Sequence, residues 1–199
     1  MKKIVILLTL FLLFGTVKAQ FGGGTGSSGD PYQISTADHL AAMATNVNAF
    51  PSISYKGVYF KMMNDISLSG YANWDPIGNG SKYFKGIFDG DNKKITGLTI
   101  SSGLGFRGLF GAIVDGCIIK NVSIDNCTIT GGSNTGGLAG SCRMNIREMA
   151  ITITNCHVSG TIKGDKGVGG LIGGIQIFDG TGGDTYNVFI SNCSSSVNV

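Results

Sequence analysis

The sequence predicts an all-β fold, a parallel β-helix (β-solenoid) with one short N-terminal capping helix, on three observations. A Gly-Gly-Leu-x-Gly motif occurs twice in the second half of the chain after a shortened Gly-Leu-x-Gly copy, and the three leucines are 29 and then 33 residues apart. A second pattern, apolar-x-Asn/Gly-apolar-x-apolar, recurs in step with it. Short apolar alternations separated by glycines lie between these motifs. Repeats of this length are typical of stacked coils, each of which covers the hydrophobic face of its neighbour.

The first 19 residues are predicted to be a secretory signal peptide. A basic start precedes an apolar run over residues 4–14, and the segment ends in the small residue Ala19, after which we expect cleavage. The run is shorter than the about 20 residues that a membrane-spanning helix needs. We therefore expect a protein that is secreted or displayed on the cell surface, and that does not span the membrane once the signal is removed.

The mature chain is expected to be electrically neutral. The full chain has 15 basic residues, of which three lie in the signal peptide. The mature chain therefore keeps 12 basic residues against 12 acidic ones. No basic stripe is visible along the sequence. The composition therefore gives no electrostatic reason to expect nucleic acid or an anionic membrane as a partner.

The domain boundaries follow from these patterns. Residues 1–19 form the signal peptide, residues 20–34 an extended N-terminal segment, and residues 35–199 the β-helix with its cap. The last residue, Val199, falls inside a fourth copy of the second pattern and before any further Gly-Gly-Leu-x-Gly. This position predicts an array that is incomplete at its C-terminus.

One helix is predicted, over about residues 36–48, with Ser35 or Thr36 as its N-cap. Leu40, Met43 and Val47 recur at helical spacing and share one face. A terminal coil of a solenoid exposes strand edges and apolar side chains, which a capping element covers. We expect this helical face to pack over the first coil.

The second pattern predicts the corners of the coils. Its apolar positions are separated by three residues and then by two, so the chain must bend once before apolar side chains face inward again. Asn and Gly tolerate the backbone of such a bend better than other residues. We expect the leading isoleucines to stack and the asparagines to form a hydrogen-bonded ladder. The alternative fold is a β-sandwich with irregular turns. The isoleucines are Ile95, Ile119, Ile153 and Ile190, and the corner residues are Gly97, Asn121, Asn155 and Asn192.

The Gly-Gly-Leu-x-Gly motif is interpreted as a structural joint. No lysine follows it at the position that a phosphate-binding loop requires. Its leucine is expected to enter the core, while its glycines allow a tight turn and a close approach between the backbones of neighbouring coils. The motif residues are Gly108, Leu109 and Gly111, then Gly137, Leu138 and Gly140, then Gly170, Leu171 and Gly173.

These motifs resemble the GLUG motif of bacterial secreted and surface proteins, which also occurs in the non-catalytic N-terminal part of M26-type IgA1-cleaving metallopeptidases. The resemblance covers nearly the whole mature chain and includes Asp30-Pro31-Tyr32, Trp74-x-Pro76-Ile77-Gly78 and Gly108-Leu109-Phe110-Gly111. It implies a right-handed β-helix, usually a module of adhesin-like or peptidase-associated proteins. The peptidase zinc motif His-Glu-x-x-His is absent, so the resemblance supplies no catalytic residue.

No catalytic residue, cofactor or metal is predicted. Glycosidases and lyases need paired or clustered carboxylates, and the acidic residues here are scattered. Asp89 and Asp91, like Asp179 and Asp184, could approach one calcium ion, but they lack further oxygen ligands, so we interpret both pairs as turn-forming.

The cysteines give no sign of a reactive or metal-binding site. No two of the five are spaced as Cys-x-x-Cys, so no zinc site is predicted. Export permits disulfides, but the odd number leaves at least one cysteine without a partner in the same chain. Cys156 and Cys193 occupy the same inward place in their repeats and are expected to be stacked buried thiols. His157 should point away from Cys156, so no catalytic pair is expected.

The leading hypothesis is a non-enzymatic module for adhesion or for binding a host protein or glycan. Three aromatic residues, Trp74, Tyr83 and Tyr186, are candidates for stacking on sugar rings. The insertions at 141–150 and 174–187 are predicted to project as recognition loops. Two alternatives are a carbohydrate-active enzyme on the same scaffold and a scaffold fragment of a larger surface peptidase.

Overall fold

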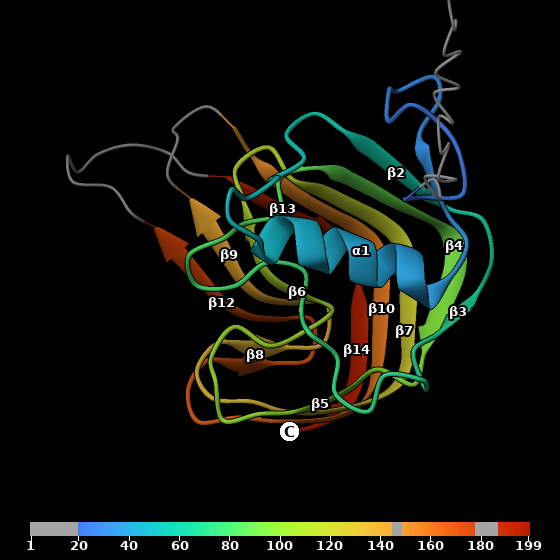
Figure 1. Cartoon of the computed structure of the whole chain (residues 1–199). Helices are drawn as coiled ribbons and strands as arrows, with labels where there is room; N and C mark the ends of the chain where they lie inside the picture. Colours follow the sequence, from blue (N-terminus) through green and yellow to red (C-terminus); the bar gives the residue numbers. More distant parts are fainter. Residues whose placement is uncertain (1–19, 145–148, 178–186) are drawn as a thin grey trace, which may run out of the picture.

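The computed structural model describes residues 20–144, 149–177 and 187–199 as a parallel β-solenoid of about four turns with one helix (Figure 1). Its strands form one long sheet, a second sheet of three strands and a third of two. The long sheet contains β1 (Tyr32–Ile34), β2 (Tyr59–Met62), β3 (Ile66–Ser67), β4 (Ile87–Thr96), β5 (Thr99–Ser101), β7 (Ile118–Thr130), β10 (Ile151–Lys163), β13 (Val188–Ser191) and β14 (Ser194–Asn198). The second contains β6 (Phe110–Val114), β9 (Ala139–Met144) and β12 (Ile172–Ile177), and the third contains β8 (Thr135–Gly136) and β11 (Val168–Gly169).

Every strand pairing among these described elements is parallel. Strands of successive coils lie side by side in the order β1-β2-β4-β7-β10-β13 in the long sheet and β6-β9-β12 in the second. A β-sandwich is built from antiparallel strands, so this topology confirms the β-helix and rules out the alternative. Within the part of the chain that the structure describes, no helix is long and apolar enough to cross a membrane.

The helix, α1 (Ala37–Asn48), lies across the N-terminal end of the stack (Figure 1). Thr36 is its N-cap, because its hydroxyl accepts a hydrogen bond from the backbone N–H of His39. The three apolar residues predicted to cover the first coil, Leu40, Met43 and Val47, are fully buried in the core. Both the helix and its packing are therefore as predicted.

The corners have the predicted backbone geometry. Asn121, Asn155 and Asn192 have φ angles of 56°, 52° and 52°, in the left-handed region that Asn and Gly tolerate. The Asn155 side chain donates from Nδ2 to Oδ1 of Asn121 at 3.1 Å and to Oδ1 of Asn92 at 3.0 Å. The asparagine ladder is therefore present at Asn121 and Asn155 and includes Asn92 of β4, but no side-chain hydrogen bond joins Asn192 to it among the described residues.

The coils of β4 and β7 turn a second corner that the sequence did not predict. Asn126 has a φ of 56° and lies inside Ile124-x-Asn126-Cys127-x-Ile129, a further instance of the same pattern. The register of β4 and β5 on β7 places Gly97, with a φ of 70°, beside Asn126. Gly97 therefore belongs to the second column of corners, and its counterpart in the first column is Asn92.

This misalignment makes one predicted stack wrong. Ile119, Ile153 and Ile190 are in register as expected. Ile95, however, pairs with Ile124, and the residue of β4 that pairs with Ile119 is Phe88. Because the pattern occurs twice in one coil, the copy that begins at Ile95 was aligned with the first column of corners, although it belongs to the second.

The motif glycines allow close packing between coils. A Cβ on Gly111 would lie 2.1 Å from the carbonyl oxygen of Gly78, one on Gly140 would lie 2.7 Å from that of Gly111, and one on Gly173 would lie 2.7 Å from that of Gly140. All three lie within strands, and the bend of the motif falls instead at its Gly-Leu step, just before each of these strands. The motif leucines point inward: Leu109 and Leu138 are fully buried, and Leu171 packs against the core.

The insertions predicted to be loops begin as strands. The first residues of the segment 141–150 belong to β9, and those of the segment 174–187 belong to β12, with Ser141 paired to Gly174. Residues 145–148 and 178–186 lie outside the described residues, as do Asp179 and Asp184. In the last described coil several apolar side chains are exposed, among them Ile175, Ile177 and Phe189.

Candidate functional site

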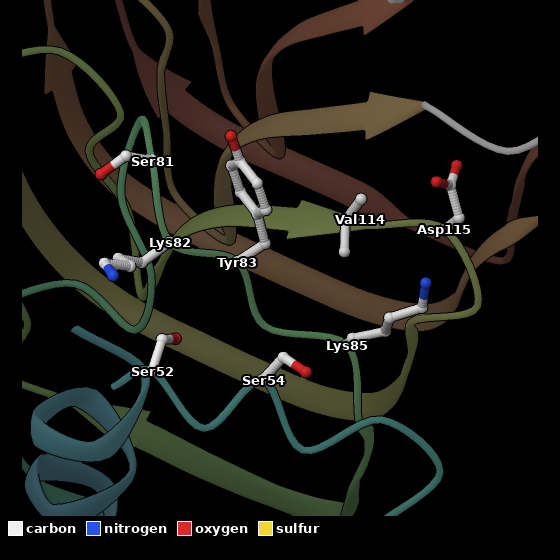
Figure 2. A pocket seen from close by; sticks show the side chains of 8 residues that line it. All are labelled: Ser52, Ser54, Ser81, Lys82, Tyr83, Lys85, Val114 and Asp115. Carbon is white, nitrogen blue, oxygen red and sulfur yellow. The ribbon is translucent and has the colours of Figure 1, made fainter. Parts of the chain in front are cut away.

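The three candidate aromatic residues have different surroundings. Trp74 is buried, and its Nε1 donates to the carbonyl oxygen of Leu109 at 3.2 Å, so its role is structural. Tyr186 lies outside the described residues. Tyr83 is half-buried and lines an open pocket of about 400 Å³ (Figure 2). Trp74 also lines a smaller pocket, of about 180 Å³, but it is only 2% exposed, so of the two described candidates Tyr83 is the one with surface left for a ligand.

The pocket, called here the Tyr83 pocket, is formed by three segments: the loop after α1, the loop before β4, and the end of β6. In Figure 2 the side chains of Lys82 and Lys85 lie toward opposite ends, with Ser54 and Tyr83 between them. The lining side chains thus carry hydroxyls, two ammonium groups, one carboxylate, one aromatic ring and one aliphatic group. The lining residues are Ser52, Ser54, Ser81, Lys82, Tyr83, Lys85, Val114 and Asp115.

Phe84 anchors this lining to the solenoid core. Its ring is fully buried, 6.0 Å from the ring centroid of Phe60 and 5.1 Å from that of Phe110. Because side chains alternate along extended backbone, burying Phe84 turns its neighbours Tyr83 and Lys85 toward the pocket. The short sequence Lys-Tyr-Phe-Lys therefore supplies both the anchor and much of the binding surface.

Backbone hydrogen bonds hold the three segments in place. The N–H of Lys85 donates to the Ser54 carbonyl at 2.7 Å, which joins the two loops. The N–H of Phe84 donates to the Ala112 carbonyl at 3.0 Å, and the N–H of Val114 donates to the Phe84 carbonyl at 3.2 Å. These bonds tie the loop before β4 to β6, so the pocket walls are part of the coil stack.

Arg143 fixes the ring of Tyr83 from a later coil. It extends from β9, and its Nη1 donates to the Tyr83 hydroxyl at 2.8 Å and to the carbonyl of Gly80. The guanidinium carbon lies 4.9 Å from the Tyr83 ring centroid, a cation–π geometry. The Tyr83 hydroxyl in turn donates to the Gly80 carbonyl at 3.2 Å. Sequence reasoning did not find this contact, because the two residues are 60 positions apart.

The pocket lysines differ from those on the long sheet. There, lysines pair with aspartates at 3.1 Å, as in Lys61–Asp91, Lys94–Asp125 and Lys120–Asp89. Neither Lys82 nor Lys85 makes an ion pair with any described residue. Asp115, the carboxylate that lines the pocket, is fully buried. The accessible charge of the pocket is therefore positive.

Asp89 and Asp91 form a turn, as the sequence suggested. Asp89 accepts the Asp91 N–H at 2.9 Å and the Asn121 Nδ2 at 3.0 Å, and it pairs with Lys120. Its oxygens are thus engaged by donors from the chain itself. Among residues 20–144, 149–177 and 187–199, no three His, Cys, Asp or Glu side chains lie close enough to share a metal ion.

The environment of Asp89 leads to a prediction about pH. Burial raises the pKa of Asp89, but hydrogen bonds from Asn121, from the Asp91 N–H and from Lys120 outweigh it and lower the pKa from its ordinary 3.8. A depressed pKa in the folded state stabilises the fold above the unfolded-state value, and this contribution is lost as pH falls through the lowered value. We expect Asp89→Asn to weaken the loss of stability below about pH 4.

Urea unfolding midpoints measured between pH 7 and pH 2.5 test this prediction. Asp165→Asn, in the exposed turn after β10, controls for the removal of a negative charge. If Asp89→Asn follows the same stability-versus-pH curve as the unmodified chain, the hydrogen bonds around Asp89 do not carry the effect.

The cysteines are structural in their surroundings. Four of the five are buried, and burial raises the pKa of Cys142 and of Cys156 to about 12, which suppresses the reactive thiolate. Cys156 pairs in register with Val122 and donates its N–H to the Cys193 sulfur at 3.4 Å. The His157 side chain lies on the exposed side instead, where its Nδ1 is 2.8 Å from the Ser194 Oγ.

Together these features define a β-solenoid module with an open, cationic pocket on its side. No protein-family model matches the sequence. The chain is 28% identical over 207 residues to the "Putative Gly-rich membrane protein" of Evansella cellulosilytica, covering 85% of this chain and 23% of that protein. It is 29% identical over 175 residues to halomucin of Haloquadratum walsbyi, covering 82% of this chain and 2% of that protein. The chain thus spans less than a quarter of either relative.

The fold also occurs in a solved structure. The crystal structure of a putative immunoglobulin A1 protease from Bacteroides ovatus superimposes with a TM-score of 0.51, over 89% of this chain and 70% of that chain. The two sequences are 19% identical, so the likeness concerns the fold alone. The chain is therefore a β-solenoid module related to parts of much larger proteins.

Proposed function

We propose that this chain is an exported, non-enzymatic β-solenoid module of the GLUG type that binds glycans at a cell surface through the Tyr83 pocket. The observation that carries the proposal is the pocket itself, in which a fixed aromatic ring stands among hydroxyl and ammonium groups. Sugars offer hydroxyls for hydrogen bonding and apolar ring faces for stacking. The volume of the Tyr83 pocket, about 400 Å³, lies within the usual range of small-molecule sites.

Export and surface placement are supported by the predicted signal peptide. Two relatives are named as a membrane protein and a halomucin, and both are far longer than this chain. Their length favours a second candidate function, in which the solenoid is a scaffold within a larger surface protein. One polypeptide can serve both functions, because a solenoid that acts as a scaffold still exposes the Tyr83 pocket.

The chemistry of the pocket favours binding over catalysis. Glycosidases use two carboxyl groups on either side of the scissile bond. Among the residues that line the Tyr83 pocket, Asp115 alone carries a carboxylate, and it is fully buried. Lysines and a tyrosine engaged with Arg143 provide orientation and charge, as a binding site requires.

A glycan array with the purified protein tests the proposal. We expect binding to a subset of glycans, and we expect Tyr83→Ala to weaken it by roughly tenfold through loss of the stacking ring. Tyr59→Ala is the matched control, since Tyr59 is a half-buried tyrosine of β2 that does not line the pocket. Depolymerisation of any bound glycan would overturn the non-enzymatic assignment. Binding that survives Tyr83→Ala unchanged would overturn the site.

A further inference from the structure

We infer that the ligand of the Tyr83 pocket is an acidic oligosaccharide that carries carboxylates on successive sugar rings, as uronic acid polymers do. This inference rests on the proposed function and narrows it to a class of glycan. It arises from the arrangement of charge, hydroxyl groups and exposed aromatic surface along the pocket.

The two ammonium groups set the expected charge of the ligand. Lys82 and Lys85 lie toward opposite ends of the pocket, and no carboxylate among the described residues pairs with either (Figure 2). The Lys85 side chain runs beside the turn at Gly116, since its Cε would lie 3.7 Å from a Cβ placed there. Two separated cations complement two separated anionic groups better than a single one.

The surface between the lysines suits sugar hydroxyls. Ser54 Oγ makes no hydrogen bond with a described residue, so it is available as both donor and acceptor. Ser52 Oγ donates its proton to the Val47 carbonyl at 2.6 Å and keeps its acceptor lone pairs. Hydroxyls placed between cations favour a polyhydroxylated anion over an inorganic one.

An exposed aromatic ring extends the pocket at the Lys82 end. Phe50 is 92% exposed, and the Lys82 ammonium lies 5.1 Å from its ring centroid. A large apolar side chain in this position leaves one ring face uncovered, which a sugar ring can cover. The exposed phenylalanine beside an unpaired lysine is a further contact surface for the same ligand.

An acidic peptide fits the pocket less well. Extended peptides are usually bound by adding a strand to a free sheet edge. The backbone N–H groups of Lys85, Phe84 and Val114 already donate to carbonyls of neighbouring segments. These three groups are therefore not open to an added strand, whereas a saccharide needs side chains only.

Isothermal titration calorimetry with oligogalacturonate at pH 7 tests the inference, with the fully methyl-esterified oligomer as the uncharged counterpart. We expect esterification to weaken binding by roughly tenfold or more. Lys82→Ala and Lys85→Ala should each weaken binding of the acid by about fivefold and leave the ester unaffected. The acid should also bind more weakly as salt is raised.

The double substitution Lys163→Ala/Lys166→Ala is the matched control, since it removes two exposed lysines, one at the end of β10 and one in the turn that follows. It should leave binding of the acid unchanged. Equal binding of acid and ester, or of a neutral glycan from the array, would overturn the inference while the proposed function stands. Equal or tighter binding of poly-glutamate would overturn it in favour of an acidic peptide. Absence of binding to every glycan would remove the proposed function itself.

Discussion

Gly111→Ala is expected to destabilise the protein by about 3 kcal/mol, because the new methyl group would collide with the backbone of the preceding coil. Its Cβ would lie 2.1 Å from the Gly78 carbonyl oxygen and 2.9 Å from that of Phe106. Both obstacles are main-chain atoms. The Gly111 N–H donates to the carbonyl of Ile77, next to Gly78, at 2.9 Å, and the Phe106 N–H donates to the Ser133 carbonyl at 2.9 Å, so neither segment moves without disturbing the stack. Urea or thermal unfolding followed by circular dichroism measures the loss.

Gly103→Ala is the control for this experiment. A Cβ at Gly103 meets no atom within 4 Å, and the residue does not have a left-handed φ. Its substitution should change stability by no more than about 0.5 kcal/mol, as expected for an exposed position. Similar unfolding midpoints for the two variants would show that the glycine column does not set the spacing between coils.

Asn155→Ala is expected to destabilise the protein by about 3–4 kcal/mol, from two sources. The residue has a φ of 52°, in which alanine is strained by about 1–2 kcal/mol. Its side chain also donates two hydrogen bonds in the ladder, to Asn121 and to Asn92, each contributing about 1 kcal/mol. The free energy of unfolding from urea titration measures the sum.

Asn155→Gly separates the two sources. Glycine adopts the left-handed backbone without strain, so this variant loses the side-chain bonds alone and should be destabilised by about half as much as Asn155→Ala. If the glycine variant were as unstable as the alanine variant, backbone strain would contribute nothing. If both were as stable as the unmodified chain, the ladder would have no role in stability.

Much of the fold is predictable because each coil repeats the same physical requirement. The left-handed corners select Asn or Gly at 121, 155 and 192, and the helix at 37–48 shows both its cap and its apolar face in the sequence. The second column of corners was missed because Asn126 sits in the same pattern as Asn121. The strands β9 and β12 were missed because glycines that pack against neighbouring backbone resemble turn glycines in sequence.

The site was less predictable, because its residues are brought together by the stacking of coils. Trp74 and Tyr83 are both aromatic residues in glycine-rich surroundings. They differ in whether the backbone directs the side chain into the core or toward the surface. The alternation around Phe84 was a usable signal, since one buried ring implies that Tyr83 and Lys85 face outward. Ser54 and Arg143 carry no such signal, because their partners are tens of residues away.

We propose that this solenoid binds its ligand in the Tyr83 pocket. Nuclear magnetic resonance titration of the ¹⁵N-labelled protein with trigalacturonate tests it most directly, because each backbone amide reports its own surroundings. We expect saturable shifts that cluster at residues 52–54, 81–85 and 114–115 and that disappear in Tyr83→Ala. Shifts confined to another face of the solenoid, or no shifts at millimolar ligand, would contradict it.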